Sequence, residues 1–343
     1  MTLYVANPLA DTRWDDLVDR HPSSSAFHQR GWLEALSRTY NYEPIVLTVS
    51  PPDQPLADSI VFCRMRSPIV GNRLVSLPFA DHCEPLVTGP EILQEFGKWL
   101  REERDQKGLK YVEIRPLNGM QDGCLEPSRS YAFHELDLEP SLEEVFARLH
   151  RDSIQRRIQR ATKEQITYDV GSSSKNLYDF YRLLLKTRRR HRLLPQPLAW
   201  FENLVACMGD SLEIRVARKN ATPVAAILTL RHKTTVVYKY GCSDRRFHNF
   251  GAMPFLFWRL IDESKSQGMK TLDFGRSDLD QESLMAFKDR FGTRRTTLTY
   301  YRYPKEKQSV AAAWSTKAVG QLCYFLPEQA FALAGKIVYP HIG

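Results

Sequence analysis

Asp273 ends a short apolar segment in the second half of the sequence and is followed by Gly275 and Arg276. Strand ends in α/β sheets face the crevice in which ligands bind, so this carboxylate is a candidate functional group. It could accept the proton of an amine or bind an ammonium ion. The structural alternative is an ion pair of Asp273 with Arg276 or Lys288 that stabilises the turn. Asp273, Arg276 and Lys288 therefore form the first candidate site.

A lysine interrupts an apolar strand pattern upstream of this site. Lys239 lies between Tyr238 and Tyr240, and the alternation of side chains along a strand directs it to the opposite sheet face. A lysine in an apolar strand requires an anionic partner, and a phosphate group would serve. Lys239 and Tyr240 are therefore candidate binding residues.

The loop after this strand contains three more candidates, Arg245, His248 and Gly251, and Pro254 lies near the first turn of the next predicted helix. Backbone amides and the dipole at a helix N-terminus favour anions. His248 is a candidate general base because a histidine ordinarily has a pKa near ~6.5. Alternatively, His248 is an exposed loop residue and Gly251 forms an ordinary tight turn.

The net charge of +8 favours acidic partners such as nucleotides, phosphorylated carriers, RNA or an anionic membrane surface. Basic residues are concentrated in two neighbouring clusters, 150–163 and 186–192. The first cluster contains three candidate ligands of a pyrophosphate: Arg156, Arg157 and Arg160. Each cluster can instead be a solvated helix face. Two clusters close together in sequence favour an anion site. From the basic helix and the charged strand residue, we expect Arg156, Arg157 and Lys239 to line one anion-binding surface.

An internal repeat organises the elements that must position these residues. Residues 100–116 and 261–277 both predict an amphipathic helix that ends at a glycine, then a lysine and a short apolar strand with an acidic residue. The two glycines, Gly108 and Gly268, lie 160 residues apart. Alternating patterns predict a hairpin before each copy, at 44–65 and 212–231. The same offset roughly aligns two predicted strands, 74–79 and 235–240. Although helix–glycine–strand units are common, the shared order and spacing favour a duplication.

The repeat divides the chain into two α+β domains, 1–138 and 139–304, and a helical tail, 305–343. A helix over 141–165 opens the second domain, with Ser141 and Glu144 as a capping box. A strand over 296–303 closes it. The tail predicts two amphipathic helices, 311–325 and 328–338. These helices either pack on the second domain or dock on the inner membrane face.

The composition and the motifs of the sequence argue against several functional classes. The six cysteines form no CxxC pair, which indicates reduced thiols in a cytosolic protein and no zinc site. The motifs of metal hydrolases, serine hydrolases, P-loop proteins and Rossmann cofactor enzymes do not occur. No signal peptide is visible at the N-terminus, and no apolar run reaches the roughly 18 residues of a spanning helix. We therefore expect a cytoplasmic location, with peripheral contact to the inner membrane as an option.

Six sequence motifs carry a family resemblance. They are FHQRGWL at 27–33, SLPF at 76–79, YVEIR at 111–115, RRIQRA at 156–161, LDFGRS at 272–277 and FKDRFG at 287–292. Together they resemble the FemAB-like transferases, nearest to the branch associated with exosortase and exopolysaccharide gene clusters. This resemblance implies two tandem GNAT-like (acyl-CoA N-acyltransferase) domains with mixed sheets flanked by helices.

The resemblance also implies an activity, which is transfer of an acyl or aminoacyl group onto an amine of a peptidoglycan or exopolysaccharide precursor. The implied donor is acyl-CoA or aminoacyl-tRNA, with no metal. The implied partners are a phosphorylated or nucleotide-linked envelope precursor and tRNA. The loop around Gly251 lacks the spaced glycine pair of a usual GNAT cradle, which puts coenzyme A in doubt. The basic clusters and this loop equally suit an alternative, a catalytically inactive GNAT-fold protein that binds RNA or acts as a scaffold.

Overall fold

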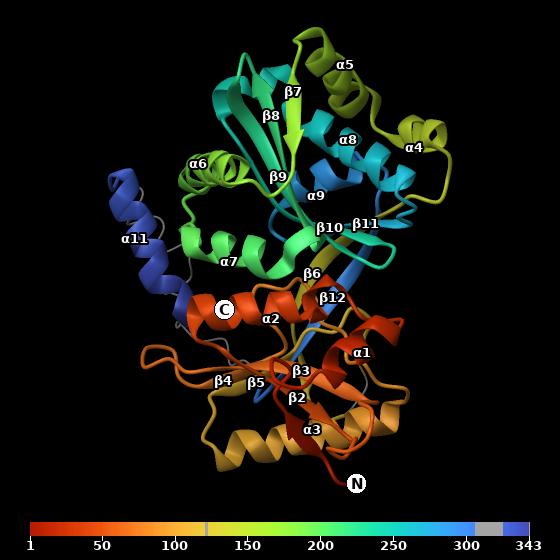
Figure 1. Cartoon of the computed structure of the whole chain (residues 1–343), viewed down its shortest axis with the longest axis vertical. Helices are drawn as coiled ribbons and strands as arrows, with labels where there is room; N and C mark the ends of the chain where they lie inside the picture. The colour runs from red at the N-terminus through yellow and green to blue at the C-terminus, as the bar shows by residue number, and fades with distance from the viewer. Residues whose placement is uncertain (121–122, 306–324, 343) are drawn as a thin grey trace.

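One mixed sheet of twelve strands runs through the whole molecule in the order β1-β2-β3-β4-β5-β12-β6-β11-β10-β9-β8-β7 (Figure 1). The structure is a computed structural model that describes residues 1–120, 123–305 and 325–342. Two strand pairs, β4–β5 and β10–β11, are parallel, and the remaining neighbours are antiparallel.

The first half lies in the lower part of Figure 1. Its elements are β1 (Tyr4–Ala6), α1 (Arg13–Arg20), α2 (Arg30–Tyr40), β2 (Glu43–Thr48), β3 (Ser59–Met65), β4 (Arg73–Val75), α3 (Pro90–Gln106), β5 (Tyr111–Ile114) and β6 (Glu126–Asp137).

The second half lies above it. Its elements are α4 (Leu142–Arg148), a π-helical turn (Arg151–Gln155), α5 (Arg156–Lys163), β7 (Thr167–Val170), α6 (Ser174–Arg190), α7 (Leu198–Met208), β8 (Leu212–Lys219), β9 (Thr222–His232), β10 (Thr235–Ser243), the 3-10 segment η4 (Arg245–Phe250), α8 (Ala252–Ser266), β11 (Thr271–Asp278), α9 (Glu282–Asp289), β12 (Arg294–Tyr303) and α11 (Glu328–Val338).

Helices cover both faces of the sheet in the second half. Alternate residues of β9 enter opposite cores: Ala226 and Leu228 pack towards α6, whereas Ala225 and Ile227 pack towards α8. A strand buried on both faces has a continuous apolar run in place of alternation, and β9 has such a run.

The predicted repeat is present in the fold. α3 and α8 each end at a glycine with positive φ, +57° at Gly108 and +76° at Gly268, and each leads into a strand, β5 or β11. The parallel partners are equivalent as well, with Leu74 opposite Val112 and Val236 opposite Leu272. Both predicted hairpins are also observed, as β2–β3 and β8–β9.

The two halves exchange their central strands. β6, which ends the first half, pairs with β11 of the second half, and β12, which ends the second half, pairs with β5 of the first. β6 and β12 also pair with each other along most of their length, so they cross between the two parts of Figure 1. The sheet of the first half is therefore completed by β12 of the second half, and the sheet of the second half by β6 of the first.

Two predicted elements differ from the structure. The helix predicted over 141–165 begins at its capping box, but its chain is extended at Leu149 and His150, and His150 Nδ1 then caps a new helical segment by accepting from the Ser153 amide. The strand expected up to Phe79 ends at Val75, because Leu77 and Phe79 have positive φ values of 53° and 62°.

The second predicted tail helix is observed as α11, and the first, 311–325, falls almost entirely outside the described residues. α11 and the turn after it contact both halves: Phe331 is buried in the core, a Cβ on Gly335 would overlap the Pro195 carbonyl, and Tyr42 Oη donates to the Tyr339 carbonyl at 3.3 Å. Within residues 1–120, 123–305 and 325–342, no helix has the length and apolar character that a bilayer crossing demands.

The halves also meet through α2 and α7, which lie side by side in Figure 1. Trp32 and Trp200 pack edge to face with ring centroids 5.2 Å apart. Gly31 brings the helices together, because a Cβ at this position would lie 2.3 Å from the Cys207 carbonyl oxygen.

We predict that Gly31→Ala destabilises the protein by about 1–3 kcal/mol, because the added methyl group overpacks a backbone contact. Helix propensity alone would give the opposite sign. Gly119→Ala is the matched control, since its Cβ would meet nothing nearer than the Tyr301 hydroxyl at 3.8 Å. Urea unfolding measures both variants, and an unchanged or higher free energy of unfolding for Gly31→Ala would contradict the contact.

Candidate functional site

Strands β10 and β11 separate at the centre of the sheet. They pair only from Thr235 opposite Thr271 to Val237 opposite Asp273. Beyond this point β10 pairs with β9 alone and β11 with β6 alone, and each of those pairings contains an irregularity, at residues 238–240 and 273–276. The two strands therefore splay apart where the candidate residues of β10 and β11 begin.

Asp81 of the first half lies at this opening. Its Oδ2 is only 2.9 Å from the position that a Cβ on Gly275 would occupy, and Gly275 also has a φ of +70°. Position 275 therefore requires glycine for two reasons. The loop after β4 thus completes the splayed end of a sheet formed by the second half.

A buried charge cluster surrounds Asp81. Lys239 Nζ donates to Asp81 Oδ2 at 2.9 Å, and Arg276 Nε lies 3.7 Å from Asp81 Oδ1. Lys288 Nζ donates to the carbonyl oxygens of Gly275 at 2.8 Å and Arg276 at 3.1 Å. Lys239 and Lys288 are buried. Lys239, Arg276 and Lys288, which we selected as candidates from the sequence, therefore lie in one cluster.

Asp273 belongs to the same cluster, with partners other than the expected Arg276 or Lys288. Its Oδ1 accepts the Gly275 amide at 2.5 Å and its Oδ2 pairs with His82 Nε2 at 3.0 Å. His82 Nδ1 is buried and has no hydrogen-bond partner among the described residues. Both Asp273 oxygens are therefore engaged within the protein, and they fix the irregular turn of β11 and the His82 ring.

Electrostatics in the cluster favour an additional negative charge. Burial lowers the pKa of Lys288 to about 8, against the opposing effect of Asp81 and Asp273. Burial likewise lowers the pKa of Lys239, although Asp81 opposes the shift. The pKa of Asp81 is lowered, because Lys239 and Arg276 outweigh the opposing effect of burial. Lys239, Arg276 and Lys288 bring three cationic side chains into this cluster, so it can stabilise an oxyanion.

A second group of candidates gathers around η4, at the N-terminus of α8. Arg157 Nη1 donates to the His248 carbonyl at 3.2 Å, and Arg190 Nη1 donates to the Ser243 carbonyl at 3.1 Å. Helices α5 and α6 thereby bring both basic clusters to one loop. Gly251 has a φ of +74°, and a Cβ there would overlap the Arg157 carbonyl, so this glycine permits the close packing of α5 on the loop.

His248 and Arg245 belong to this loop. His248 is exposed and its Nε2 lies 2.9 Å from Ser243 Oγ. Burial lowers the pKa of His248, with further contributions from the charges of Arg190 and Arg245. The arginines around this loop form a cationic rim at a helix N-terminus, an arrangement that suits phosphate groups.

The structure separates Lys239 from the arginines with which we grouped it. Arg156 is exposed and pairs with Asp152 at 2.8 Å, and Arg160 pairs with Glu164 at 2.6 Å. Tyr240 is buried, and its hydroxyl accepts from Trp200 Nε1 at 3.0 Å. The expected single anion surface of Arg156, Arg157 and Lys239 is therefore wrong, because Lys239 is buried against a carboxylate.

Sequence reasoning missed Asp81 and His82. They follow the motif SLPF at 76–79, in the copy of the repeat that we did not nominate as the site. An acid and a histidine directly after a strand motif were the available signal. Their pairing with β10 and β11 depends on contacts between distant segments, since His82 and Asp273 are 191 residues apart.

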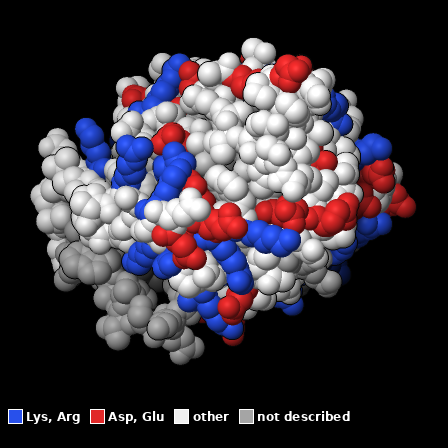
Figure 2. All heavy atoms as spheres, turned by 90° about the horizontal axis from the view of Figure 1, so that it is seen from below, with Lys and Arg blue, Asp and Glu red and all other residues white. Residues whose placement is uncertain are grey.

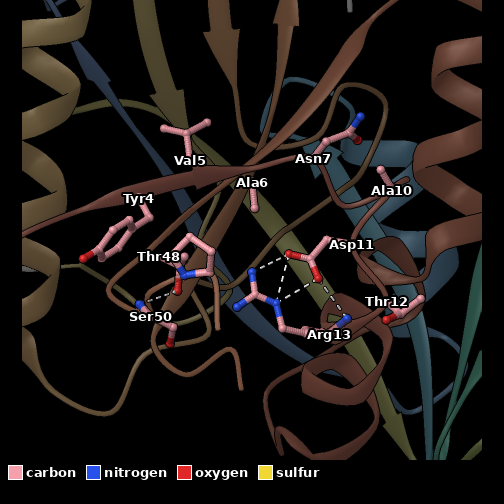
Figure 3. Close-up of a pocket in the computed structure, with 11 residues that line it drawn as sticks. Tyr4, Val5, Ala6, Asn7, Ala10, Asp11, Thr12, Arg13, Thr48 and Ser50 are labelled. Atoms are coloured by element: carbon pink, nitrogen blue, oxygen red, sulfur yellow. Dashed lines mark hydrogen bonds and ion pairs between the residues drawn. The ribbon is translucent and has the colours of Figure 1, made fainter. Parts of the chain in front are cut away.

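One hollow of the described surface lies away from these two groups. Figure 3 shows this hollow of about 440 Å³ beside β1, where both Asp11 oxygens bind Arg13. Arg13 also donates to the Pro51 carbonyl, so these polar groups already have partners within the protein. On the face viewed from below, acidic and basic side chains alternate in a band and no large patch of one sign is visible (Figure 2).

Comparison with known proteins agrees with the fold. Residues 148–289, which include Lys239, Asp273 and Lys288, match the family model described as acetyltransferase (GNAT) domain. This segment is therefore similar to that domain family. No curated protein matches the chain by sequence.

Solved structures extend the likeness to both halves. FemX is similar with a TM-score of 0.69 and 14% identity over 88% of this chain and 97% of that one. A tandem GNAT protein from the clavulanic acid pathway matches with a TM-score of 0.52 and 9% identity over 90% and 100%. The C-terminal domain of a putative lysylphosphatidylglycerol synthetase from Agrobacterium fabrum matches with a TM-score of 0.52 and 15% identity over 90% and 94%. The predicted tandem GNAT-like fold is confirmed, and the match of residues 148–289 to the acetyltransferase model agrees with an N-acyltransferase.

We predict that Asp81→Asn destabilises the protein by about 3 kcal/mol, because it leaves the Lys239 ammonium buried without its counter-ion. Removing both charges in Asp81→Asn/Lys239→Met should recover most of this loss. Guanidinium unfolding of the two single variants and the double variant gives the coupling energy. Additive effects of the two substitutions would contradict a direct pair.

Proposed function

We propose that this protein transfers an acyl or aminoacyl group to an amine of a cell-envelope precursor, at the cluster where Asp81 meets β10 and β11. One observation carries the proposal: a buried lysine, Lys288, is held by two backbone carbonyls beside the ion pair of Asp81 and Lys239. Two of the three ammonium hydrogens are engaged, and the third is available to a developing oxyanion.

In the proposed reaction, the acceptor nitrogen attacks the carbonyl carbon of the donor. The new N–C bond forms, the bond from the carbonyl carbon to the donor oxygen or sulfur breaks, and the amine proton ends on that leaving atom. The Lys288 ammonium stabilises the negative charge on the carbonyl oxygen between these events. Asp273 is a positioning residue in this scheme, because its bond to the Gly275 amide shapes the turn whose carbonyls hold Lys288.

The donor in this proposal binds through phosphate groups at η4. Arg157 and Arg190 contact that loop, Arg245 belongs to it, and α8 begins directly after it. This chemistry suits either coenzyme A or the phosphates of aminoacyl-tRNA. The name of one structural neighbour, a putative lysylphosphatidylglycerol synthetase, supports an aminoacyl donor and an envelope acceptor. The tandem GNAT neighbour supports an acyl-CoA donor.

The envelope precursor is the proposed acceptor, and its nucleotide or phosphate part agrees with the net charge of +8. We place the reaction in the cytoplasm, with reversible contact to the inner membrane where a lipid-linked acceptor is used. Product analysis by mass spectrometry, with labelled donor and nucleotide-linked or lipid-linked amine precursors, tests this. Tight RNA binding without product from any amine would favour the inactive RNA-binding alternative.

We predict that Lys288→Met lowers kcat by roughly 10²–10³, the usual effect of removing one oxyanion donor. The ammonium form is the active one, and its pKa is about 8, so activity should persist below that pH and decline above it. In Lys288→Arg the charge does not titrate, and this decline should disappear from the pH profile of kcat. Circular dichroism checks that each variant is folded. A folded Lys288→Met variant with the wild-type kcat would exclude the role.

We predict that Arg157→Ala and Arg245→Ala each weaken donor binding by about 1–3 kcal/mol, the value of a charge-assisted hydrogen bond. Arg156→Ala is the matched control, because Arg156 is exposed on the same helix and pairs with Asp152. Calorimetry with acetyl-CoA and with a non-hydrolysable aminoacyl-tRNA analogue also distinguishes the two donors. Equal losses in all three variants would indicate a general charge effect and no specific donor site.

A further inference from the structure

Arg276 differs from the other cations of the cluster in being partly open to solvent. Its side chain is 31% exposed, whereas that of Lys239 is 6% exposed. The guanidinium carbon lies 4.0 Å from the ring centroid of Tyr131 on β6 and 5.3 Å from that of Tyr300 on β12. The two exchanged strands therefore hold this side chain at the edge of the buried site.

The guanidinium donors of Arg276 are not used within the described protein. The side chain makes no hydrogen bond there, and the distance from its Nε to Asp81 Oδ1 is 3.7 Å, too long for one. The neighbouring Arg115 shows the contrast, since it donates to both Glu113 and the Leu77 carbonyl. A guanidinium offers five N–H donors in a planar fork.

Arg276 is also fixed relative to the proposed reaction. Its carbonyl oxygen accepts from Lys288 Nζ, so its own backbone is part of the support for that ammonium. Stacking on the Tyr131 ring restricts the plane of the guanidinium, which favours two parallel hydrogen bonds to a carboxylate or phosphate. A ligand bound there would lie next to the reacting centre.

We propose that Arg276 is a specificity-determining residue that binds an anionic group of the acceptor. The substrate class is then an amine that carries a carboxylate or phosphate on the same molecule. This inference rests on the proposed function, because it assigns the acceptor side of the same site. Carboxylate and phosphate share the required chemistry, and matched amines separate them.

The test compares two pairs of amines, alanine with alaninamide and glucosamine 6-phosphate with glucosamine. Calorimetry with the full chain measures binding, and transfer from the donor that binds measures kcat/KM. We expect at least a tenfold preference for one anionic member over its neutral partner, and loss of that preference in Arg276→Gln. Arg276→Lys should retain part of it. The control is Arg294→Gln, which removes an exposed charge from β12 outside the site and should keep the preference.

The outcomes separate this inference from the proposed function. Binding that prefers the anionic amine, is lost in Arg276→Gln and occurs without transfer supports the anion site and contradicts the transferase. Transfer without any preference, or with a preference that Arg276→Gln leaves unchanged, overturns the assignment of Arg276. A lower melting temperature of Arg276→Gln with an unchanged preference would identify the stack on Tyr131 as purely structural.

Discussion

The pair formed by Asp81 and Lys239 is the interaction on which the site depends. Lys239 lies on a strand in the middle of the sheet, where an ammonium without a partner would be very costly. Its counter-ion comes from the other half of the chain, through the opening between β10 and β11. The second half therefore cannot hold its charge cluster in this form unless the first half is folded against it.

The exchange of β6 and β12 explains how that contact is maintained. Because each strand completes the sheet of the other half, the two halves cannot rotate as independent domains without breaking a strand pair. The same strands carry Tyr131 and Tyr300, which stack on Arg276. Sheet continuity and site geometry thus depend on the same hydrogen bonds, and duplication of a GNAT-like unit gives a composite site in place of two separate ones.

The two groups of functional candidates lie along β10. Lys239 is in the interior of the strand and faces the charge cluster, while Ser243 at its end contacts Arg190 and His248 at the cationic rim. An acyl carrier held by its phosphates at the rim would have its reactive end directed towards the strand interior. The side chains of Lys239 and Lys288 are buried, so in the proposed reaction little water would reach the carbonyl.

The sequence by itself determined the local elements and the duplication. Amphipathic periodicity, glycine caps and the 160-residue spacing predicted both helix–glycine–strand units and both hairpins, because these features depend on residues close together in the chain. It also nominated Asp273, Arg276 and Lys288, which share one short stretch. The strand predicted over 74–79 was too long, because Leu77 and Phe79 have positive φ values that end it.

Only the tertiary structure decided which nominated residues act together. We expected Lys239 to bind a phosphate, but it pairs with Asp81. We expected Asp273 to pair with an arginine or a lysine, but it pairs with His82. Neither partner could be inferred from local pattern, since the contacts join residues 158 and 191 positions apart. The physical reason is that a buried charge selects its partner by proximity in space, and that proximity was set by the exchange of two strands between the halves.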